Sequence, residues 1–408
     1  MRLTKFFYVT TCALGLFPLL KLSHFSILMM IWLVLAMVNA VNNKTFSTLK
    51  KYKYPFVILS FFCLMYVVYL PFTEDFKELG KSIVKSLPFL VFPLGFLLNK
   101  EIVTEKLMRS IGTVFIASVI VLNIFGWINV LNFGWNDAWQ QNDFYHPVFR
   151  ELFFRATSLH LPYLGLLSVF GALWLTFKMF SVKKMLLLKL AGIVFILFSV
   201  YIYSARMALM CYLTGLLFIL WKSIKNRKIK WTLSVVLPLC AIAFIWISPI
   251  KERYIKNVEK EFVLPHKEQQ PHEVNYRYGI LYCATNLISD HFFTGVGADK
   301  VQQRLNDCYG NFTYESYEDF TKVTYNSHNQ YLDQMLKFGI VGLLLFLVVL
   351  FYYYPHSSVL YQTFIIITAV SLLTENIFDR QTGVVFFSLL NTIFVILKIN
   401  TLEKSISS

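Results

Sequence analysis

Twelve apolar runs of 17 to 22 residues make up more than half of this chain and limit what it can fold into. A helix that crosses a bilayer needs about 20 apolar residues, so each run is close to the length of a span. The chain is 57% hydrophobic and 15% charged, against about 45–50% and about 25% in soluble domains. A soluble enzyme and a disordered chain are therefore excluded, and the sequence predicts an all-α integral membrane protein with about twelve transmembrane helices. The runs lie at 6–22, 24–41, 55–72, 82–98, 111–132, 162–180, 186–203, 205–221, 231–248, 337–354, 357–374 and 381–398.

The basic residues predict the orientation of these helices. Lys and Arg number 38 against 23 Asp and Glu. If the N-terminus is cytoplasmic, the cytoplasmic segments hold twenty basic residues and the short outward loops hold seven. Because cytoplasmic loops of membrane proteins carry such an excess, we expect both ends in the cytoplasm and do not interpret the positive charge as a nucleic-acid surface. The first run follows Arg2 and Lys5 without a small-residue cleavage site, so we interpret it as a span.

Two outward segments are long enough to carry a functional site. One covers about 133–161, and a much larger one covers 249–336 between the ninth and tenth runs. The chain is therefore divided into residues 1–248, the large loop at 249–336 and residues 337–408. Long loops on a rigid scaffold are where function usually lies. The cytoplasmic loops contain no phosphate-binding Gly-x-x-x-x-Gly-Lys motif, so we expect outward-facing chemistry on a substrate that carries its own activation.

The large loop contains two of the six cysteines, Cys283 and Cys308. An oxidising compartment permits a disulfide between them, and two free thiols are the alternative. The sequence has no Cys-x-x-Cys pair and no outward carboxylate cluster with metal-ligand spacing, so we expect no metal site.

Two outward arginines are candidates for anion binding. Arg206 lies at the junction of the seventh and eighth runs, and Arg277 lies in the large loop before a helical stretch that ends near Ile288. Gly295 and Gly297 then mark a tight turn. Ionisable residues at membrane depth are functional candidates. The alternatives are an interfacial arginine whose charge reaches the headgroups and a solvated loop arginine.

His328 is the strongest candidate for a catalytic base. It lies in Asn326-Ser327-His328-Asn329, and Leu332, Met335 and Leu336 follow at helical spacing before the tenth run. A neutral imidazole near the bilayer surface can accept a proton from a hydroxyl. A structural histidine is the alternative.

Four further residues are weaker candidates. Arg155 and His160 precede the sixth run and have the alternative of ordinary interfacial polarity. Glu375 and Arg380 lie with Asp379 between the last two runs, where they could simply pair with one another.

Together these motifs resemble those of the O-antigen ligase and O-antigen polymerase superfamily of bacterial envelope glycosyltransferases. His328-Asn329 is followed by nine residues and then Gly339-Ile340-Val341-Gly342, which matches the ligase pattern completely. Ser204-Ala205-Arg206 is similar to the family's arginine element at the start of a span. Arg277, a helix and Gly295-Val296-Gly297 are similar to its loop element. The Arg155–His160 match is weaker, because Leu161 separates His160 from Pro162.

The resemblance implies a GT-C-like membrane enzyme in the bacterial inner membrane, with a periplasmic active site and no cofactor. The implied donor is a glycan on undecaprenyl diphosphate. Arg206 and Arg277 would bind its diphosphate, and His328 would deprotonate the acceptor hydroxyl. Arg155, His160, Asn329, Glu375 and Arg380 are further candidate substrate contacts.

Three functions remain open from the sequence. The favoured one is a ligase that transfers the glycan to lipid A–core. A polymerase would instead use a second lipid-linked repeat unit as the acceptor, and a transporter of lipid-linked glycans belongs to another class. The single dominant outward loop favours the ligase, and we find no internal repeat of the kind many transporters show. The expected partners are thus these glycans and membrane lipids, and no nucleic acid.

Overall fold

The computed structural model describes residues 2–142, 147–181, 184–247, 264, 276–311 and 324–407, which form helices and no strand. The first half contains α1 (Arg2–Ala13), η1 (Leu14–Leu16), α2 (Leu22–Asn43), α3 (Ser47–Lys51), α4 (Lys53–Tyr69), η2 (Leu70–Phe72), α5 (Phe76–Ser86), α6 (Pro88–Leu98), η3 (Lys100–Ile102), α7 (Glu105–Phe133), α8 (Trp135–Gln141), α9 (Val148–Thr157) and α10 (Leu161–Ser181). The second half contains α11 (Leu186–Ile202), α12 (Arg206–Ser223), α13 (Arg227–Ile247), α15 (Tyr276–Asp290), α16 (Val301–Tyr309), α18 (Gln330–Phe351), α19 (Val359–Ser371), η6 (Ile377–Asp379) and α20 (Gln381–Ser407).

The apolar helices confirm a multi-pass membrane protein. Eight helical segments in the described residues are long and apolar enough to cross a bilayer. Three more of the expected spans coincide with shorter apolar helices at Lys5–Leu16, Leu186–Ile202 and Val359–Ser371. The remaining expected span, 231–248, coincides with α13, which is not among the eight. The count of twelve stays a prediction.

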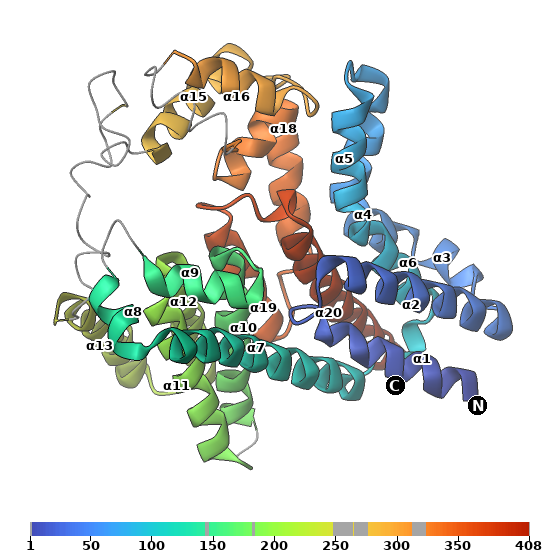
Figure 1. Ribbon diagram of the computed structural model, residues 1–408. Coiled ribbons are helices and arrows are strands. Elements are labelled where there is room, and N and C mark those ends of the chain that lie inside the picture. The colour runs from blue at the N-terminus through green and yellow to red at the C-terminus, as the bar shows by residue number, and fades with distance from the viewer. Residues whose placement is uncertain are drawn as a thin grey trace.

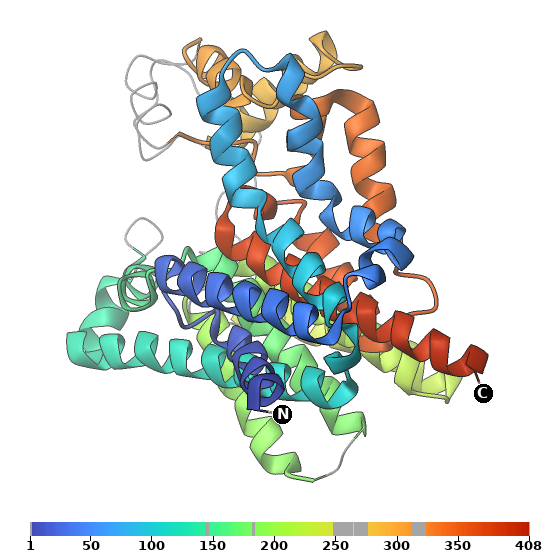
Figure 2. The same ribbon diagram turned by 90° about the vertical axis from the view of Figure 1, so that its right-hand side faces the viewer.

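The two expected outward loops are described only in part. Residues 143–146 of the smaller loop, and residues 249–263, 265–275 and 312–323 of the large loop, lie outside the described residues. The rest of the large loop contains α15 and α16, which lie above α18 at the top of Figure 1. Figure 2 shows α4, α5 and α18 rising from the bundle toward them.

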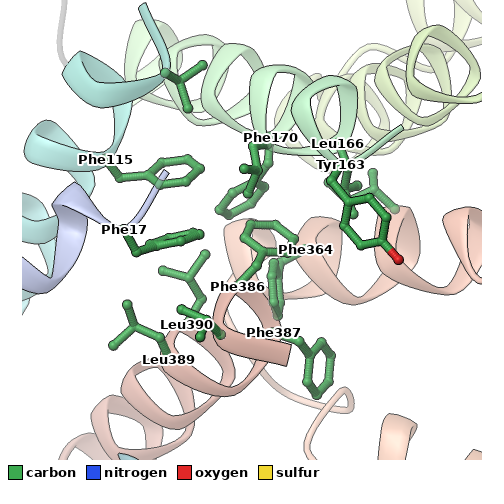
Figure 3. Close-up of a cluster of buried hydrophobic side chains, with 14 of the residues drawn as sticks. Phe17, Phe115, Tyr163, Leu166, Phe170, Phe364, Phe386, Phe387, Leu389 and Leu390 are labelled. Carbon is green, nitrogen blue, oxygen red and sulfur yellow. The ribbon is translucent and has the colours of Figure 1, made fainter. Parts of the chain in front are cut away.

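An aromatic core holds the lower bundle together. Figure 3 shows Phe17, Phe115, Phe170, Phe364 and Phe386 meeting from different segments of the chain. The ring centroids of Phe17 and Phe115 are 5.6 Å apart, and those of Phe170 and Phe364 are 5.2 Å apart. Such pairs stabilise packing beyond their buried area. The core fixes α7, α10, α19 and α20, and the candidate site is built on their ends.

Candidate functional site

His328 lies immediately before α18 in a left-handed backbone conformation, with φ of 46°. The side chain of Asn326 accepts the His328 N–H at 3.1 Å, and the side chain of Asn329 caps α18 by accepting the N–H groups of Tyr331 and Leu332. Non-glycine residues with positive φ are uncommon and often occur at functional sites. The Asn329 side-chain oxygen therefore caps the helix, and the expected role of Asn329 as a substrate contact stays a prediction.

Several hydrogen bonds join the loop between α19 and α20 to the segment around His328. Ser327 and Asn376 exchange side-chain hydrogen bonds, the shorter of 3.0 Å. The Gln330 side chain accepts the N–H of Phe378 at 2.8 Å, and the Gln330 N–H donates to the carbonyl of Leu372 at 2.9 Å. These bonds hold residues 372–378 against the start of α18.

This arrangement places Glu375 opposite His328. The Nδ1 atom of His328 is 3.7 Å from Oε2 of Glu375. Nδ1 is buried and has no hydrogen-bond partner, whereas the imidazole side chain as a whole is 27% exposed. Glu375 therefore does not pair with Arg380, as the sequence allowed, but faces the histidine, and a shift of under an ångström would join the two by a charge-assisted hydrogen bond.

Three arginines meet in a cavity beside Glu375. This arginine cavity has a volume of about 260 Å³. It is lined by Arg150, Pro162, Tyr163, Leu166, Ser204, Ala205, Arg206, Met207, Ala208, Cys211, Arg277, Ser371, Thr374, Glu375 and Ile377. The structure thus brings Arg206 and Arg277 together although 71 positions separate them. The charged residues that line the cavity are three arginines and one glutamate.

Arg150 is the arginine that the sequence analysis missed. Its Nη1 donates to the carbonyl oxygens of Tyr203 and Ser204 at 3.0 and 3.2 Å, which fixes the turn before Arg206. Burial, followed by the nearby charges of Arg206 and Arg277, lowers the pKa of Arg150 from its ordinary value. Three guanidinium groups close enough to repel one another are the arrangement that an anionic ligand stabilises.

The first turn of α12 adds to this positive potential. Arg206, Met207 and Ala208 form that turn, and all three line the arginine cavity. The N–H of Arg206 donates to the carbonyl of Ser204 at 3.0 Å, and the positive end of the helix dipole favours phosphate or carboxylate there. Apolar side chains such as Leu166 and Ile377 form the other walls, so the cavity is suited to a phosphate attached to a lipid.

The other expected contacts lie elsewhere. Arg155 is exposed and forms an ion pair with Glu151 one turn away, outside the cavity lining. His160 and Arg380 line a second, larger hollow on the other side of Tyr163. Nothing in the residue type separates Arg150 from Arg155. No sequence signal distinguished the two, because both lie in the same outward loop and each follows a phenylalanine.

The two glycine motifs lie against each other. A Cβ added to Gly339, which has φ of 66° and lies at a kink in α18, would be 2.0 Å from the Phe293 carbonyl oxygen. A Cβ on Gly295 would be 2.6 Å from the Leu336 carbonyl oxygen. The N–H of Val296 donates to Leu336 at 2.7 Å. Only glycine permits this backbone contact, and it ties the segment after α15, whose first turn carries Arg277, to the helix after His328.

The remaining motif glycines and the cysteines support the same region. Gly297 has φ of 102°, and a Cβ on Gly342 would be 2.2 Å from the Phe338 side chain. A disulfide joins Cys283 in α15 to Cys308 in α16.

A buried ion cluster below this region was not predicted. Nζ of Lys337 is 2.5 Å from Asp333 and 2.7 Å from Asp379. Lys337 is 6% exposed and Asp333 is 1% exposed. Buried charges must be paired, so this cluster fixes η6 to α18. Among the residues that the structure describes, no group of His, Cys, Asp and Glu has the arrangement of a metal site.

These features define the class of protein: a multi-pass membrane protein with a cationic, partly apolar cavity beside a histidine–glutamate pair. Residues 191–347 match the family model described as O-antigen ligase. The match confirms the resemblance to the O-antigen ligase superfamily that the motifs predicted, and the family implies a membrane enzyme similar to glycosyltransferases. Arg206, Arg277, His328 and the four motif glycines lie inside the matched segment, whereas Arg150 and Glu375 lie outside it. A comparison with curated proteins found no match.

Proposed function

We propose that this protein is an inverting glycosyltransferase of the O-antigen ligase type. It moves a glycan from undecaprenyl diphosphate to a sugar hydroxyl of lipid A–core at the periplasmic face of the inner membrane. The observation that carries this proposal is the position of His328 against Glu375, because Glu375 lines a cavity with three arginines. A base beside a phosphate-binding cavity suits group transfer from a diphosphate to a hydroxyl.

The arginine cavity binds the donor diphosphate. Arginine remains charged and bonds phosphate oxygens in bidentate fashion. Arg206 and Arg277 contact the diphosphate, Arg150 adds its charge while holding the turn at Ser204, and the first turn of α12 contributes N–H groups. The apolar wall accommodates the first part of the polyprenyl chain. Positive charge fixed at this position stabilises the negative charge that develops on the leaving diphosphate.

His328 is the general base. The acceptor hydroxyl oxygen attacks the anomeric carbon of the donor sugar and forms the new glycosidic bond. The bond between that carbon and the phosphate oxygen breaks, and undecaprenyl diphosphate leaves with the electron pair. The hydroxyl proton passes to Nε2 of His328, because Nδ1 faces Glu375. The Glu375 carboxylate orients the ring and stabilises the imidazolium, as carboxylates do for catalytic histidines.

Transfer by the purified protein tests this proposal. The donor is an undecaprenyl-diphosphate glycan, the acceptor is lipid A–core or a second lipid-linked repeat unit, and nucleotide and metal are omitted. His328→Asn removes the base but keeps a residue that tolerates positive φ, and we expect it to lower kcat by about 10²–10⁴-fold. His356→Asn is the matched control, because His356 also has positive φ, 59°, and is exposed in the loop before α19.

The outcomes separate the three functions. Product on lipid A–core that His328→Asn loses and His356→Asn keeps supports the ligase. Elongated lipid-linked glycan identifies a polymerase with the same donor chemistry. No product with either acceptor, together with movement of the donor across liposome membranes, would overturn the enzyme proposal.

A further inference from the structure

A second hollow lies on the other side of Tyr163 from the arginine cavity. This central groove has a volume of about 1380 Å³. Its walls come from the segment 18–23, α5, the end of α9, α16, the start of α18 and the segment 378–382. In Figure 1 these elements surround the middle of the molecule, with α5 on one side and α9 on the other.

The two hollows share one lining residue, Tyr163, near the proposed catalytic pair. The hydroxyl of Tyr163 donates to the carbonyl of Asn376 at 3.0 Å. Along the loop between α19 and α20, Glu375 lines the arginine cavity while Asp379 and Arg380 line the groove. Asn326, whose side chain accepts the N–H of His328, also lines the groove. A ligand in the groove is therefore close to the two segments that carry Glu375 and His328.

The groove is lined by five Lys and Arg side chains and by six Asp and Glu side chains. Lys337 lies at bonding distance from Asp333 and Asp379, and Lys81 pairs with Glu78. In the described part of the chain, no carboxylate is within ion-pairing distance of Lys85 or Arg380. The helix α5, which carries Lys85, packs against η6, which ends at Asp379, the residue before Arg380, and the charge of Lys85 helps to lower the pKa of Asp379. Two cations that have no carboxylate at ion-pairing distance, on the wall of a large hollow, can bind an anionic group.

The rest of the lining indicates what carries the anion. Gln302, Gln303, Asn306 and Asn326 place amide groups on the wall beneath α16. Amides can donate to and accept from the same ligand, which matches the paired donor and acceptor character of sugar hydroxyls. A lining of amides with a local cationic pair fits a saccharide with a negative group at one position.

We propose that the central groove binds the acceptor glycan, and that this acceptor carries a phosphate group bound by Lys85 and Arg380. The inference rests on the proposed function and deepens it by assigning the second substrate. Lipid A–core carrying phosphate groups and a lipid-linked repeat with its diphosphate share this chemistry. Both place phosphate on the acceptor side of His328, away from Arg206 and Arg277.

Steady-state kinetics of the full-length protein in detergent test the assignment. Lys85→Met and Arg380→Gln each raise the acceptor KM about tenfold, because each removes one charge-assisted bond. The donor KM and kcat at saturating acceptor stay unchanged. Lys77→Met is the matched control, because Lys77 is on the same helix as Lys85 but does not line the groove. Unchanged acceptor KM in both variants, or an equal rise in donor KM, would overturn the assignment.

A binding measurement that needs no transfer separates this inference from the proposed function. The probes are fluorescent lipid A–core, the same glycan after phosphatase treatment, and a lipid-linked repeat. We expect the wild type to bind a phosphorylated probe about tenfold more tightly than Lys85→Met or Arg380→Gln does, and the probe with the larger loss identifies the phosphate source. Equal binding of treated and untreated lipid A–core, with no loss for the lipid-linked repeat, would overturn the assignment. Phosphate-dependent binding by a wild type that transfers nothing would overturn the proposed function and leave the groove as a site.

Discussion

Arg150 and Arg155 stand on the same short helix, α9, and only Arg150 reaches the arginine cavity. Arg155 forms an exposed ion pair with Glu151, and such pairs contribute about 0–1 kcal/mol. Arg150 is instead held by two backbone carbonyls and repelled by two other arginines. The same residue type therefore has two different roles within two turns of a helix.

Replacing Arg150 should weaken donor binding more than replacing Arg155. Arg150→Gln removes one of three positive charges at the cavity and the bonds that fix the Ser204 turn, so we expect the donor KM to rise about tenfold or more. Arg150→Lys keeps the charge and should lose less. Arg155→Gln is the control and should change the donor KM by less than about twofold. The measurement is initial rate against donor concentration at fixed acceptor. An equal effect in Arg150→Gln and Arg155→Gln would contradict the assignment.

At the scale of single residues, the sequence predicted the motif residues but not the side chains that they contact. Arg206, Arg277 and His328 were identified because their order and spacing resemble a family pattern. Glu375 was only a weak candidate, because its meeting with His328 depends on hydrogen bonds between Ser327 and Asn376, which lie 49 positions apart. Local sequence does not encode which loops meet, so Arg150 had no signal that distinguished it from Arg155.

The sequence analysis placed the helix α18 correctly but began it at the wrong residue. The sequence analysis began the tenth span at residue 337, whereas α18 begins at Gln330. The sequence analysis noted helical spacing at Leu332, Met335 and Leu336, but the polar residues Gln330, Asp333, Gln334 and Lys337 kept these two turns out of the apolar run. These four polar side chains are buried. Hydrogen bonds and ion pairs to the loop before α20 make this polar face stable inside the protein.

Gly339→Ala should destabilise the protein strongly. The new Cβ would overlap the Phe293 carbonyl at a backbone φ of 66°, and steric strain together with a disfavoured φ should cost about 2–4 kcal/mol. Gly80→Ala in α5 is the matched control, because nothing lies within 4 Å of its added Cβ. Since alanine is the better helix former, the control should be neutral or more stable by about 0.5–1 kcal/mol. Thermal unfolding in detergent measures both. Similar midpoints for the two variants would show that the glycine contact is not tight.

At the scale of the whole molecule, basic residues from segments far apart in the chain gather around Glu403. Glu403 near the C-terminus lies 2.8 Å from Lys51 and 2.5 Å from Lys100, and Figure 1 shows both termini at the same end of the bundle. All three segments were expected in the cytoplasm. The arginine cavity and the central groove contain residues expected on the outward side. The assignment of the loops to two faces, and the side of the membrane that each face meets, stay predictions.

One carboxylate, that of Asp299, joins the segment before α16 to the segment before α5. Asp299, at 8% exposure, precedes α16. Its Oδ2 accepts the Thr73 hydroxyl and the N–H groups of Glu74 and Asp75 at 2.8 to 3.0 Å. Burial alone would raise the pKa of Asp299, but these donors lower it below its ordinary value of 3.8. Because the folded state favours the ionised form, Asp299 stabilises the fold at neutral pH.

Because the ionised form of Asp299 stabilises the folded state, the free energy of unfolding should depend on pH. The stabilisation by Asp299 should be complete above pH 3.8 and should disappear as the pH falls through the lower pKa of the folded state. Asp299→Asn should therefore lower stability by about 1–3 kcal/mol at pH 7, and the gap to the wild type should narrow below pH 3.8. Asp290→Asn, at the exposed end of α15, is the control, and its free energy of unfolding should stay close to that of the wild type at every pH. A gap between wild type and Asp299→Asn that stays constant, or widens, as the pH falls would show that the ionised carboxylate does not hold α16 to the segment before α5.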